Sequence, residues 1–240
     1  MVIILILLLL GQAMGQLTTE LAAKNPKRGL VFLFNASYPL DYSQFTGPGN
    51  KNINKIKSEG GTVRYVLGFN EPDIPRKWGG SDISPTEAAT LWQQYIQPLY
   101  SQGIKLRTPG VSSSPDGFTW MSSFFKACSG CIFDLLCIHH YGRPASSLKA
   151  HIERYHKLYP PLPIWLTEFA DSKDTLNNTK QYISQALSQL DTTPYLERYS
   201  YFGASSELVS SIGPYAALLD NDGQLKPIGN SYFFAGNPQA

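Results

Sequence analysis

The chain has 240 residues, 42% of them hydrophobic, a length that one (β/α) barrel of roughly 250 residues would account for. Its 20 basic and 18 acidic side chains nearly balance, giving a net charge of +2, and no dense basic stripe is present, which argues against a nucleic-acid partner. Three cysteines, an odd number, rule out complete disulfide pairing within the chain.

The first 15 residues have the pattern of a signal peptide. An unbroken apolar run from Val2 to Leu10 is too short, at about nine residues, to span a bilayer. Ala13-Met14-Gly15 supplies the small residues of a cleavage site. We therefore predict that residues 1–15 are removed. We expect residues 16–240 to form a single domain that is monomeric, has no membrane contact and is secreted to the extracellular space or cell wall.

Two sequons agree with a secreted chain. Asn35-Ala36-Ser37 directly follows an expected strand, and Asn177-Asn178-Thr179 lies in a polar connection. Both predict N-linked glycosylation of a surface segment, so we expect a glycoprotein.

Short apolar runs alternate along the chain with segments of helical periodicity. Strands are expected at 29–34, 65–69, 104–109, 133–141, 164–170 and 195–202. Helices are expected at 52–58, 84–102, 120–126, 148–158 and 182–190, followed by helical or irregular segments at 208–219 and 228–234. This alternation predicts parallel β–α units and favours an α/β fold of the (β/α)8 TIM-barrel type. A doubly wound sheet is the weaker alternative, because it would require a phosphate-binding glycine loop.

Two of the expected strands carry a glutamate near the end. Tyr65 to Phe69 runs into Asn70-Glu71-Pro72, where the proline stops further ladder pairing. Glu168 lies near the end of the apolar segment 164–170. Because parallel α/β enzymes place their reactive groups at the C-terminal ends of strands, we expect the two carboxylates to share one pocket.

A pair of carboxylates in one pocket is the requirement for hydrolysis of glycosidic bonds. Retaining enzymes hold the two groups roughly 5–5.5 Å apart, so that one protonates the leaving oxygen and the other attacks the sugar. Glu71 and Glu168 are the candidate catalytic residues, and Asn70 is a candidate ligand of the sugar 2-hydroxyl. The alternative is that each glutamate caps a helix or pairs with a nearby cation.

The strand that ends at Tyr141 contains two adjacent histidines. Neighbouring side chains on a strand point in opposite directions, so only His139 and Tyr141 can face the pocket together. His140 then faces away, and no metal site is expected. His151 and His156 lie on the following helix and are expected to be solvated.

Aromatic residues are candidates for sugar-stacking surfaces. We select Trp78, in a glycine-rich loop, with Trp165 and Tyr201 as further substrate-binding candidates. Trp120 is another candidate, with a core position as the alternative. A serine hydrolase is not favoured, since no Gly-x-Ser-x-Gly elbow is present.

The cysteines favour a disulfide over a zinc site in a secreted chain. Cys137 lies within an expected strand, where it is either a buried thiol or the partner of Cys128 or Cys131. The sequence leaves this pairing open.

Several motifs together resemble glycoside hydrolase family 128, the glycosyl hydrolase catalytic core of fungal secreted endo-β-1,3-glucanases. The resemblance runs from about Lys27 to Tyr232. The motifs are Leu67-Gly68-Phe69-Asn70-Glu71-Pro72-Asp73, Pro85-Thr86-Glu87-Ala88-Ala89 with Leu91-Trp92, Asp134 with His139-x-Tyr141-Gly142, Trp165-Leu166-Thr167-Glu168-Phe169, and Glu197-Arg198-Tyr199 with Phe202.

The resemblance implies a (β/α)8 barrel with retaining chemistry and no cofactor. It implies that Glu71 is the acid/base at the end of the fourth strand and that Glu168 is the nucleophile at the end of the seventh. It also shows where this chain departs from the family. His140 stands where a tryptophan is frequent, and Tyr201 is a further departure.

The gravest departure is in residues 35–63, where the family has its second and third strands. About thirty residues cannot supply two strands with their crossover helices, each of which needs at least ten to twelve residues. The predicted barrel therefore lacks these two strands, which would expose the edges of the first and fourth strands unless they pair or are covered.

The sequence thus predicts a secreted retaining endo-β-1,3-glucanase that acts on the β-1,3-glucan of fungal cell walls. One alternative is an inactive or truncated cell-wall protein that binds β-glucan. Another is a related barrel enzyme that acts on β-mannan or β-1,4-glucan.

Overall fold

The computed structural model describes residues 27–31, 53, 57, 58, 60, 63–171, 174–203, 212, 213, 215–220, 222 and 224–234. The predicted signal peptide, the Asn35 sequon and nearly all of the segment 35–63 lie outside these residues. The described residues fall into two compact units, one ending at Ile138 and the other comprising residues 27–31 and the chain from His139 onward. Each unit is described by itself.

The first unit is built on parallel strands. Strand β2 (Tyr65–Leu67) pairs in parallel with β3 (Lys105–Arg107), with Tyr65 opposite Lys105. Single bridges from Asn70 to Gly110 and from Val111 to Ile138 continue the parallel pairing beyond the ends of these strands. The strand ends are therefore held in register where the chain leaves the sheet.

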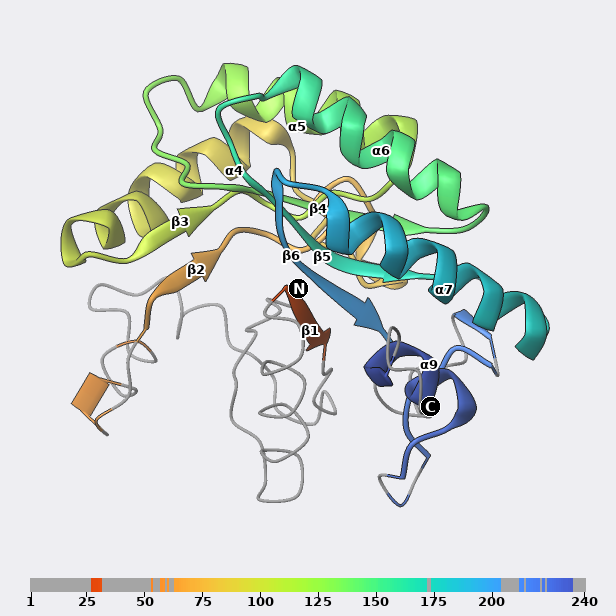
Figure 1. The fold of residues 1–240 in the computed structure, drawn as a ribbon. Coiled ribbons are helices and arrows are strands. Elements are labelled where there is room, and N and C mark those ends of the chain that lie inside the picture. The colour runs from red at the N-terminus through yellow and green to blue at the C-terminus, as the bar shows by residue number, and fades with distance from the viewer. Residues whose placement is uncertain are drawn as a thin grey trace. The chain divides into compact units, whose positions relative to one another are not determined.

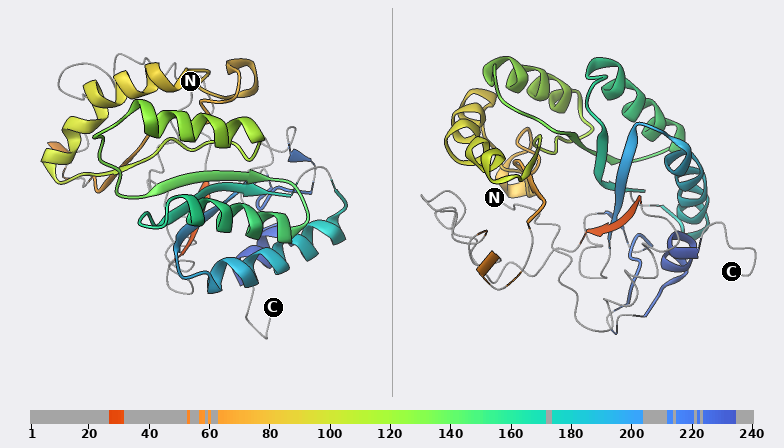
Figure 2. Two further views of the ribbon diagram at one scale, coloured as in Figure 1. Left: turned by 90° about the horizontal axis from the view of Figure 1, so that it is seen from above. Right: turned by 60° about the vertical axis from the view of Figure 1, so that its left-hand side comes forward.

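Helical segments connect these strands (Figure 1). Helix η1 (Arg76–Trp78) follows β2, and α4 (Pro85–Leu91) continues through the π-helical η2 (Trp92–Ile96) and the 3-10 helix η3 (Gln97–Gln102). Helix α5 (Pro115–Ala127) follows β3 and packs beside α4 (Figure 2).

The helices α4 and α5 begin at similar caps. The Ser84 side chain accepts a hydrogen bond from the Glu87 N–H (3.2 Å), and Pro85 occupies the first helical position, as the sequence predicts. The Ser114 side chain accepts from the Gly117 N–H (3.1 Å) in the same way. The prediction that α5 begins at Trp120, after a loop, was therefore wrong, and the Ser114-Pro115 pair is the signal that marks its start.

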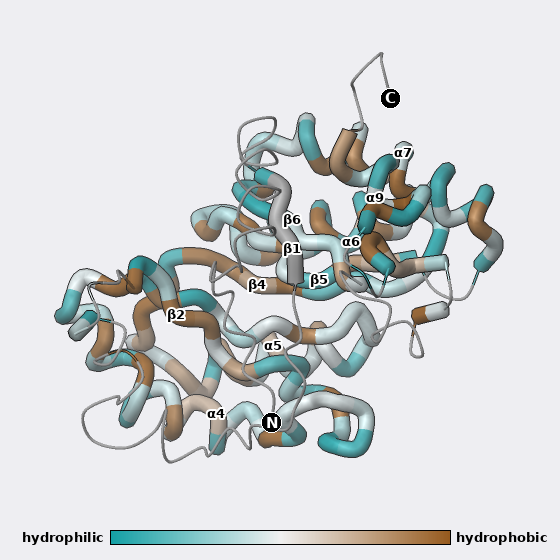
Figure 3. The backbone as a smooth tube through the Cα atoms, turned by 90° about the horizontal axis from the view of Figure 1, so that it is seen from below, coloured by the Kyte–Doolittle hydropathy of each residue, from teal (hydrophilic) through white to brown (hydrophobic). Residues whose placement is uncertain are grey.

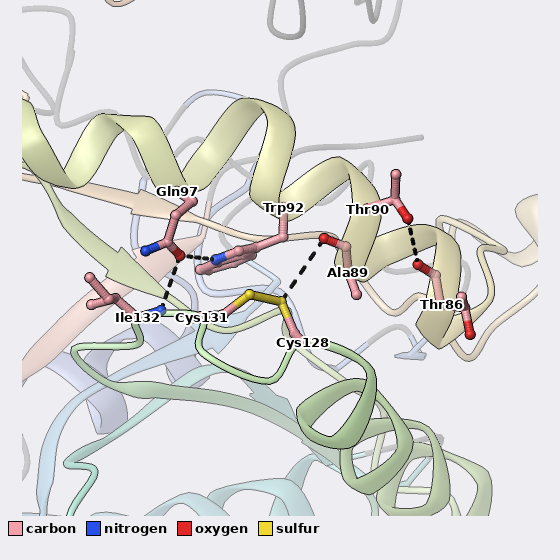
Figure 4. Close-up of a disulfide and its surroundings, with 8 residues drawn as sticks. All are labelled: Thr86, Ala89, Thr90, Trp92, Gln97, Cys128, Cys131 and Ile132. Carbon is pink, nitrogen blue, oxygen red and sulfur yellow. Dashed lines mark hydrogen bonds between the residues drawn. A yellow bond between two sulfur atoms is a disulfide. The ribbon is translucent and has the colours of Figure 1, made fainter.

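The core of the first unit contains an aromatic cluster, and one of its rings, Trp92, lies beside a disulfide (Figure 4). The Trp92 ring lies 4.9 Å from Phe133 and 5.9 Å from Phe124, and Trp120 stacks on Phe124 at 5.2 Å. Trp120 is buried and its indole N–H donates to the Ile83 carbonyl (2.8 Å), so its core position is confirmed and a sugar-binding role is excluded.

The disulfide joins Cys128 to Cys131, whose Cα atoms are 5.4 Å apart, and Cys137 is a buried free thiol. This resolves the alternatives that the sequence left open. Gln97 accepts from the Trp92 indole (3.1 Å) and from the Ile132 N–H (3.0 Å), which ties the loop after the disulfide to η2 (Figure 4).

The second unit carries a sheet of four strands in the order β1-β6-β5-β4. Its strands are β1 (Arg28–Val31), β4 (Leu136–Tyr141), which begins in the first unit, β5 (Ile164–Ala170) and β6 (Leu196–Phe202). Strand β6 pairs in parallel with both β1 and β5. All seven residues of β5 are buried, as expected of a parallel strand covered on both faces.

Three helices of this unit follow the strands: α6 (Ala145–Leu158), α7 (Leu176–Thr192) and α9 (Pro227–Phe234). Helix α7 packs against both α6 and α9 (Figure 1). Hydrophobic and hydrophilic residues alternate along these helices (Figure 3), as expected of helices that cover a sheet on one side. Among the described residues, no helix combines the length and the hydrophobicity that a membrane span requires.

The described residues confirm an α/β architecture with parallel strands. They show a sheet of four strands and a pair of two, so the complete eight-stranded barrel is not confirmed. The predicted absence of the second and third strands concerns a segment that lies almost entirely outside the described residues and stays a prediction.

Helix α6 covers β4 through two histidines. The rings of His140 and His151 lie 5.4 Å apart, and both side chains are buried. The prediction that His151 is solvated was therefore wrong. His156 is also partly covered, since its ring stacks on Tyr195 at 3.7 Å. Burial lowers the pKa of His140 to about 4, and burial together with the neighbouring His140 lowers the pKa of His151 to about 3.

We expect this histidine pair to make folding sensitive to acid. Below the ordinary histidine pKa of 6.5 the unfolded chain binds protons that the folded chain does not. The free energy of unfolding therefore decreases as the pH is lowered from 6.5 towards the pKa of the histidine in the folded protein. Each such histidine should weaken folding by about 2 kcal/mol between pH 7 and pH 5. Urea unfolding at the two pH values measures this effect. Between pH 7 and pH 5, the His151→Asn variant should lose less free energy of unfolding than the wild type, by about this amount. Ser146→Ala, at an exposed position of the same helix with no titratable side chain, is the control and should keep the wild-type dependence on pH.

Candidate active site

The first part of the site is the end of β2, where backbone pairing continues up to Glu71. The Gly110 N–H donates to the Phe69 carbonyl (3.0 Å), and the Glu71 N–H donates to the Gly110 carbonyl (2.7 Å). Glu71 then adopts a left-handed backbone with φ of 36°. Such a conformation is strained for a residue other than glycine and is characteristic of functional sites. Glu71 thus directly follows the parallel pairing at the strand end, as predicted, and it is half-exposed.

The loop after Glu71 folds back onto the same strand end. The Asn70 carbonyl accepts from the Ser81 N–H (2.9 Å) and the Ser81 hydroxyl (2.6 Å). The Asn70 amide nitrogen donates to the Gly79 carbonyl (3.3 Å). At position 80 only glycine fits, because a Cβ would lie 2.0 Å from the Ile74 carbonyl oxygen. The turn therefore presents Asn70 and Glu71 on a closed loop.

Trp78 projects from this loop. It ends η1, and its side chain is 70% exposed, with the Lys77 ammonium 5.5 Å from the ring centre. An exposed indole on a well-defined loop is a suitable surface for a sugar ring. Sugar binding by Trp78 and by Asn70 stays a prediction.

A second anchor of this loop was not predicted from the sequence. The Asp73 carboxylate accepts from the Ser112 N–H (3.1 Å) and from the Ser112 hydroxyl (2.5 Å). Ser112 is buried and lies two residues beyond Gly110. Position 117, in the first turn of α5, must stay small, since a Cβ there would lie 2.3 Å from the Ser112 carbonyl oxygen.

The second part of the site surrounds Glu168 on β5. The Tyr141 hydroxyl donates to Glu168 Oε2 (2.5 Å), and His139 Nδ1 lies 3.4 Å from the same oxygen. Glu168 and His139 are both buried. The prediction that His139 and Tyr141 share one side of β4 is confirmed. His140 points the other way, with its Nε2 3.2 Å from the Ser147 hydroxyl.

These contacts fix one carboxylate oxygen with groups from the neighbouring strand. A hydroxyl bonded to an ionised carboxylate makes one of the stronger hydrogen bonds in proteins. The Tyr141 ring is itself supported by Phe202, at 5.5 Å and an angle of 78°. No functional role was assigned to Phe202 from the sequence, although its position at the end of β6 is a signal that could have identified it.

Tyr201, the neighbour of Phe202, does not fit its predicted role. Its ring is completely buried, 5.3 Å from Phe169 and 5.7 Å from Tyr232. Burial raises the pKa of Tyr201 far above its ordinary value. A sugar cannot reach this ring. The physical reason is strand alternation, which turns Phe202 to the face of Tyr141 and Tyr201 to the opposite face.

Trp165 also lies apart from the Glu168 carboxylate. It is buried near the start of β5, roughly 10 Å along the strand from Glu168. Its indole N–H donates to Glu197 Oε2 (3.0 Å), and the Arg198 guanidinium lies 5.1 Å from its ring. These contacts with the start of β6 explain the position of the Trp165 side chain, and no contact with a substrate is needed to explain it.

Beyond the strand ends, Arg143 connects the segments that follow β4 and β5. Its Nε lies 3.1 Å from Oδ1 of the buried Asp171, and Asp174 is a second acidic partner. The Gly142 N–H donates to the Ala170 carbonyl (3.1 Å). The end of β4 that carries Tyr141 is thereby held to the end of β5.

The predicted catalytic residues thus occupy one strand end in each unit. Glu71 belongs to the first unit, and Glu168, with Tyr141 and His139, belongs to the second. Their action on a common substrate stays a prediction.

The sequence matches a family described as glycosyl hydrolase catalytic core over residues 43–232. A relative, alkali-sensitive linkage protein 1 of Schizosaccharomyces pombe, is 37% identical over 175 residues, which is 70% of this chain. The aligned part is only 32% of that protein, so this chain spans about a third of the relative it matches.

Solved structures of glycoside hydrolase family 128 are similar as well. An exo-β-1,3-glucanase from Aureobasidium namibiae has a TM-score of 0.69 and 26% identity, over 79% of this chain and 73% of that one. An endo-β-1,3-glucanase from Lentinula edodes has a TM-score of 0.66 and 29% identity, over 78% and 75%. Two oligosaccharide-binding proteins, from Trichoderma gamsii and Cryptococcus neoformans, are 24% and 23% identical and share the fold alone.

The contact between α5 and Ser112 gives a testable prediction. Replacing a helical glycine by alanine ordinarily stabilises a helix by about 1 kcal/mol. Gly117→Ala should instead destabilise the protein, because the added Cβ meets the Ser112 carbonyl. Thermal unfolding would measure the sign. Thr119→Ala, at an exposed site of α5, is the control and should not lower the melting temperature; a Gly117→Ala variant that melts higher than wild type would contradict the packing described here.

We conclude from the matched family, the relative and the similar structures, together with the strand-end glutamates at positions 71 and 168, that this chain belongs to glycoside hydrolase family 128.

Proposed function

We propose that the chain is a secreted, retaining endo-β-1,3-glucanase that hydrolyses the β-1,3-glucan of fungal cell walls by double displacement. The observation that carries this proposal is the arrangement around Glu168, whose carboxylate is buried at a strand end and fixed by Tyr141 and His139. The family supports a glycosidase, and its members include endo- and exo-acting β-1,3-glucanases.

Glu168 has the properties of a nucleophile. A nucleophilic carboxylate must keep one oxygen directed at the anomeric carbon, and contacts to the other oxygen set that direction. Tyr141 and His139 both approach Oε2. We assign the attack on the sugar to the other oxygen, Oε1.

Glu71 has the properties of the acid/base. It is half-exposed on a loop whose backbone is held by Gly110, so it can exchange protons with water between the two steps. In the first step Glu71 gives its proton to the leaving glycosidic oxygen while Glu168 forms a bond to the anomeric carbon. In the second step Glu71 takes a proton from water, and that water displaces Glu168.

The same loop supplies the proposed substrate contacts. Trp78 would stack on a glucosyl ring through its exposed face, and Asn70 would bind the 2-hydroxyl of the sugar being cleaved. Tyr201 and Trp165 are not part of the proposed site, because their rings are buried in contacts with the protein. The substrate is therefore proposed to be a polysaccharide held from one side by the loop after β2.

The first test is release of reducing sugar from a soluble β-1,3-glucan by the purified chain. Glu168→Gln should reduce cleavage to background, and Glu71→Gln should reduce it about 10²- to 10⁴-fold, the usual contribution of a general acid/base. Glu153→Gln, an exposed glutamate on α6 paired with Lys149, should cleave like wild type. A folded wild-type protein that binds glucan without cleaving it would favour the binding-protein alternative, and cleavage of β-mannan or β-1,4-glucan instead would change the substrate.

The retaining mechanism has its own test. NMR of the reaction with a β-linked substrate should show β-configured reducing ends before mutarotation, since two displacements restore the starting configuration. An initial α-configured product would overturn the assignment of Glu168 as a nucleophile.

The Tyr141 contact predicts a further effect. Tyr141→Phe removes the donor to Glu168 while keeping the ring against Phe202. We expect kcat to fall at least about tenfold, because a nucleophile that is less well oriented reacts more slowly. Tyr100→Phe, at a half-exposed tyrosine of η3, is the matched control and should leave kcat unchanged. Equal rates for Tyr141→Phe and wild type would show that this hydrogen bond has no role in the reaction.

A further inference from the structure

The loop that carries Glu71 is attached at two points to the segment that follows β3. The first is the backbone bond from the Glu71 N–H to the Gly110 carbonyl (2.7 Å). The second is the Asp73 carboxylate, which accepts both the N–H and the hydroxyl of Ser112. One residue separates the attachment points on each side, Pro72 on the loop and Val111 on the segment after β3, so the second attachment lies directly beside the first.

The second attachment point is itself rigid. The Ser112 hydroxyl also lies 2.9 Å from the hydroxyl of Ser114, the N-cap of α5. A Cβ at Gly117 would lie 3.3 Å from Asp73 Oδ2, so the carboxylate is packed against the first turn of this 13-residue helix. The positive end of the helix dipole favours a negative charge at this place.

This attachment acts on a residue with a strained backbone. Glu71 has φ of 36°, and the surrounding contacts must hold a non-glycine residue in that region. The Glu71 carbonyl accepts from the Ile74 N–H (2.9 Å) and the Ser81 N–H (3.2 Å). Those two bonds close the loop on itself, whereas the Asp73–Ser112 contact fixes the loop to the neighbouring strand.

We propose that Asp73 and Ser112 are positioning residues for Glu71 that hold its carboxyl group where it can protonate the leaving oxygen. The proposal rests on the proposed function, in which Glu71 is the acid/base. Without the contact, the loop would keep its internal hydrogen bonds but would lose one of its two attachments to the segment after β3. Proton transfer would then slow, because a general acid must stay within hydrogen-bond reach of the oxygen it protonates.

The experiment compares substrates that need the acid with substrates that do not. Phenyl and dinitrophenyl β-laminaritriosides differ in their leaving group, and only the poorer leaving group, phenolate, needs a proton as it departs. The measured quantity is kcat/KM, which reports the step in which this group leaves. Ser112→Ala should lower kcat/KM for the phenyl substrate about 10- to 100-fold, the effect of a small misplacement. The dinitrophenyl substrate should be nearly unaffected.

Two further variants and one control keep the test decisive. Ser112→Thr retains the hydroxyl and should restore phenyl hydrolysis. Asp73→Asn keeps the size of the side chain but not its charge, and it should show the same leaving-group dependence as Ser112→Ala. It provides the second test if a threonine does not fit at position 112. Ser84→Ala removes a serine cap of the same unit whose hydroxyl accepts from the Glu87 N–H of α4, and it should affect neither substrate. Circular dichroism at the assay temperature confirms that each variant is folded.

The outcomes separate this proposal from the proposed function. Equal losses on both substrates in Ser112→Ala and Asp73→Asn would overturn the positioning role and indicate general loosening of the structure. Unchanged rates on both substrates would overturn it as well. The proposed function is tested separately with Glu71→Ala, for which azide should restore cleavage of the dinitrophenyl substrate, because azide displaces Glu168 from the anomeric carbon in place of water and gives a β-glycosyl azide. If azide has no such effect, Glu71 is not the acid/base, whatever the Ser112 variants do.

Discussion

The alternation of side chains along β4 is the constraint on which both the fold and the site of the second unit depend. Ile138 and His140 face one side of the strand, and His139 and Tyr141 face the other. On the first side His140 packs against His151 of α6, which holds the helix to the sheet. On the second side His139 and Tyr141 both approach Glu168. A shift of one residue in this strand would exchange the two sets and remove the contacts to Glu168.

In the first unit the corresponding constraint is close contact between backbone segments. The loop after β2 returns to its own strand through Ser81, and this is possible because Gly80 lets the Glu71 and Ile74 carbonyls approach. Gly117 similarly allows α5 to begin directly above Ser112. These short distances leave Glu71 little freedom, although it is on a loop. The glutamate is therefore positioned by the strands β2 and β3 and not by its own side-chain contacts alone.

The two halves of the proposed mechanism make different demands on the protein. A nucleophile works best when it is buried and oriented, and Glu168, the proposed nucleophile, is buried and held by Tyr141 and His139 of the neighbouring strand. An acid/base must exchange its proton with water between steps, and the half-exposed Glu71 meets that need. Structures with this fold include glucanases and oligosaccharide-binding proteins, so the fold alone does not decide between cleavage and binding.

Local patterns in the sequence were enough to predict much of the structure. An apolar run predicted the strand Ile164–Ala170, and a proline after Ser84 predicted the helix cap there. Apolar runs and the proline after Glu71 also predicted the strand-end positions of Glu71 and Glu168. Strand alternation predicted that His139 and Tyr141 share one side. Only the tertiary structure decided which partners meet. In the structure Phe202, and not Tyr201, lies beside Tyr141, and His151 is buried. Cys128 is paired with Cys131, and Asp73 contacts Ser112, which is 39 positions away in the sequence. The physical reason is that local patterns fix the direction of a side chain, whereas its neighbours are set by how distant segments pack.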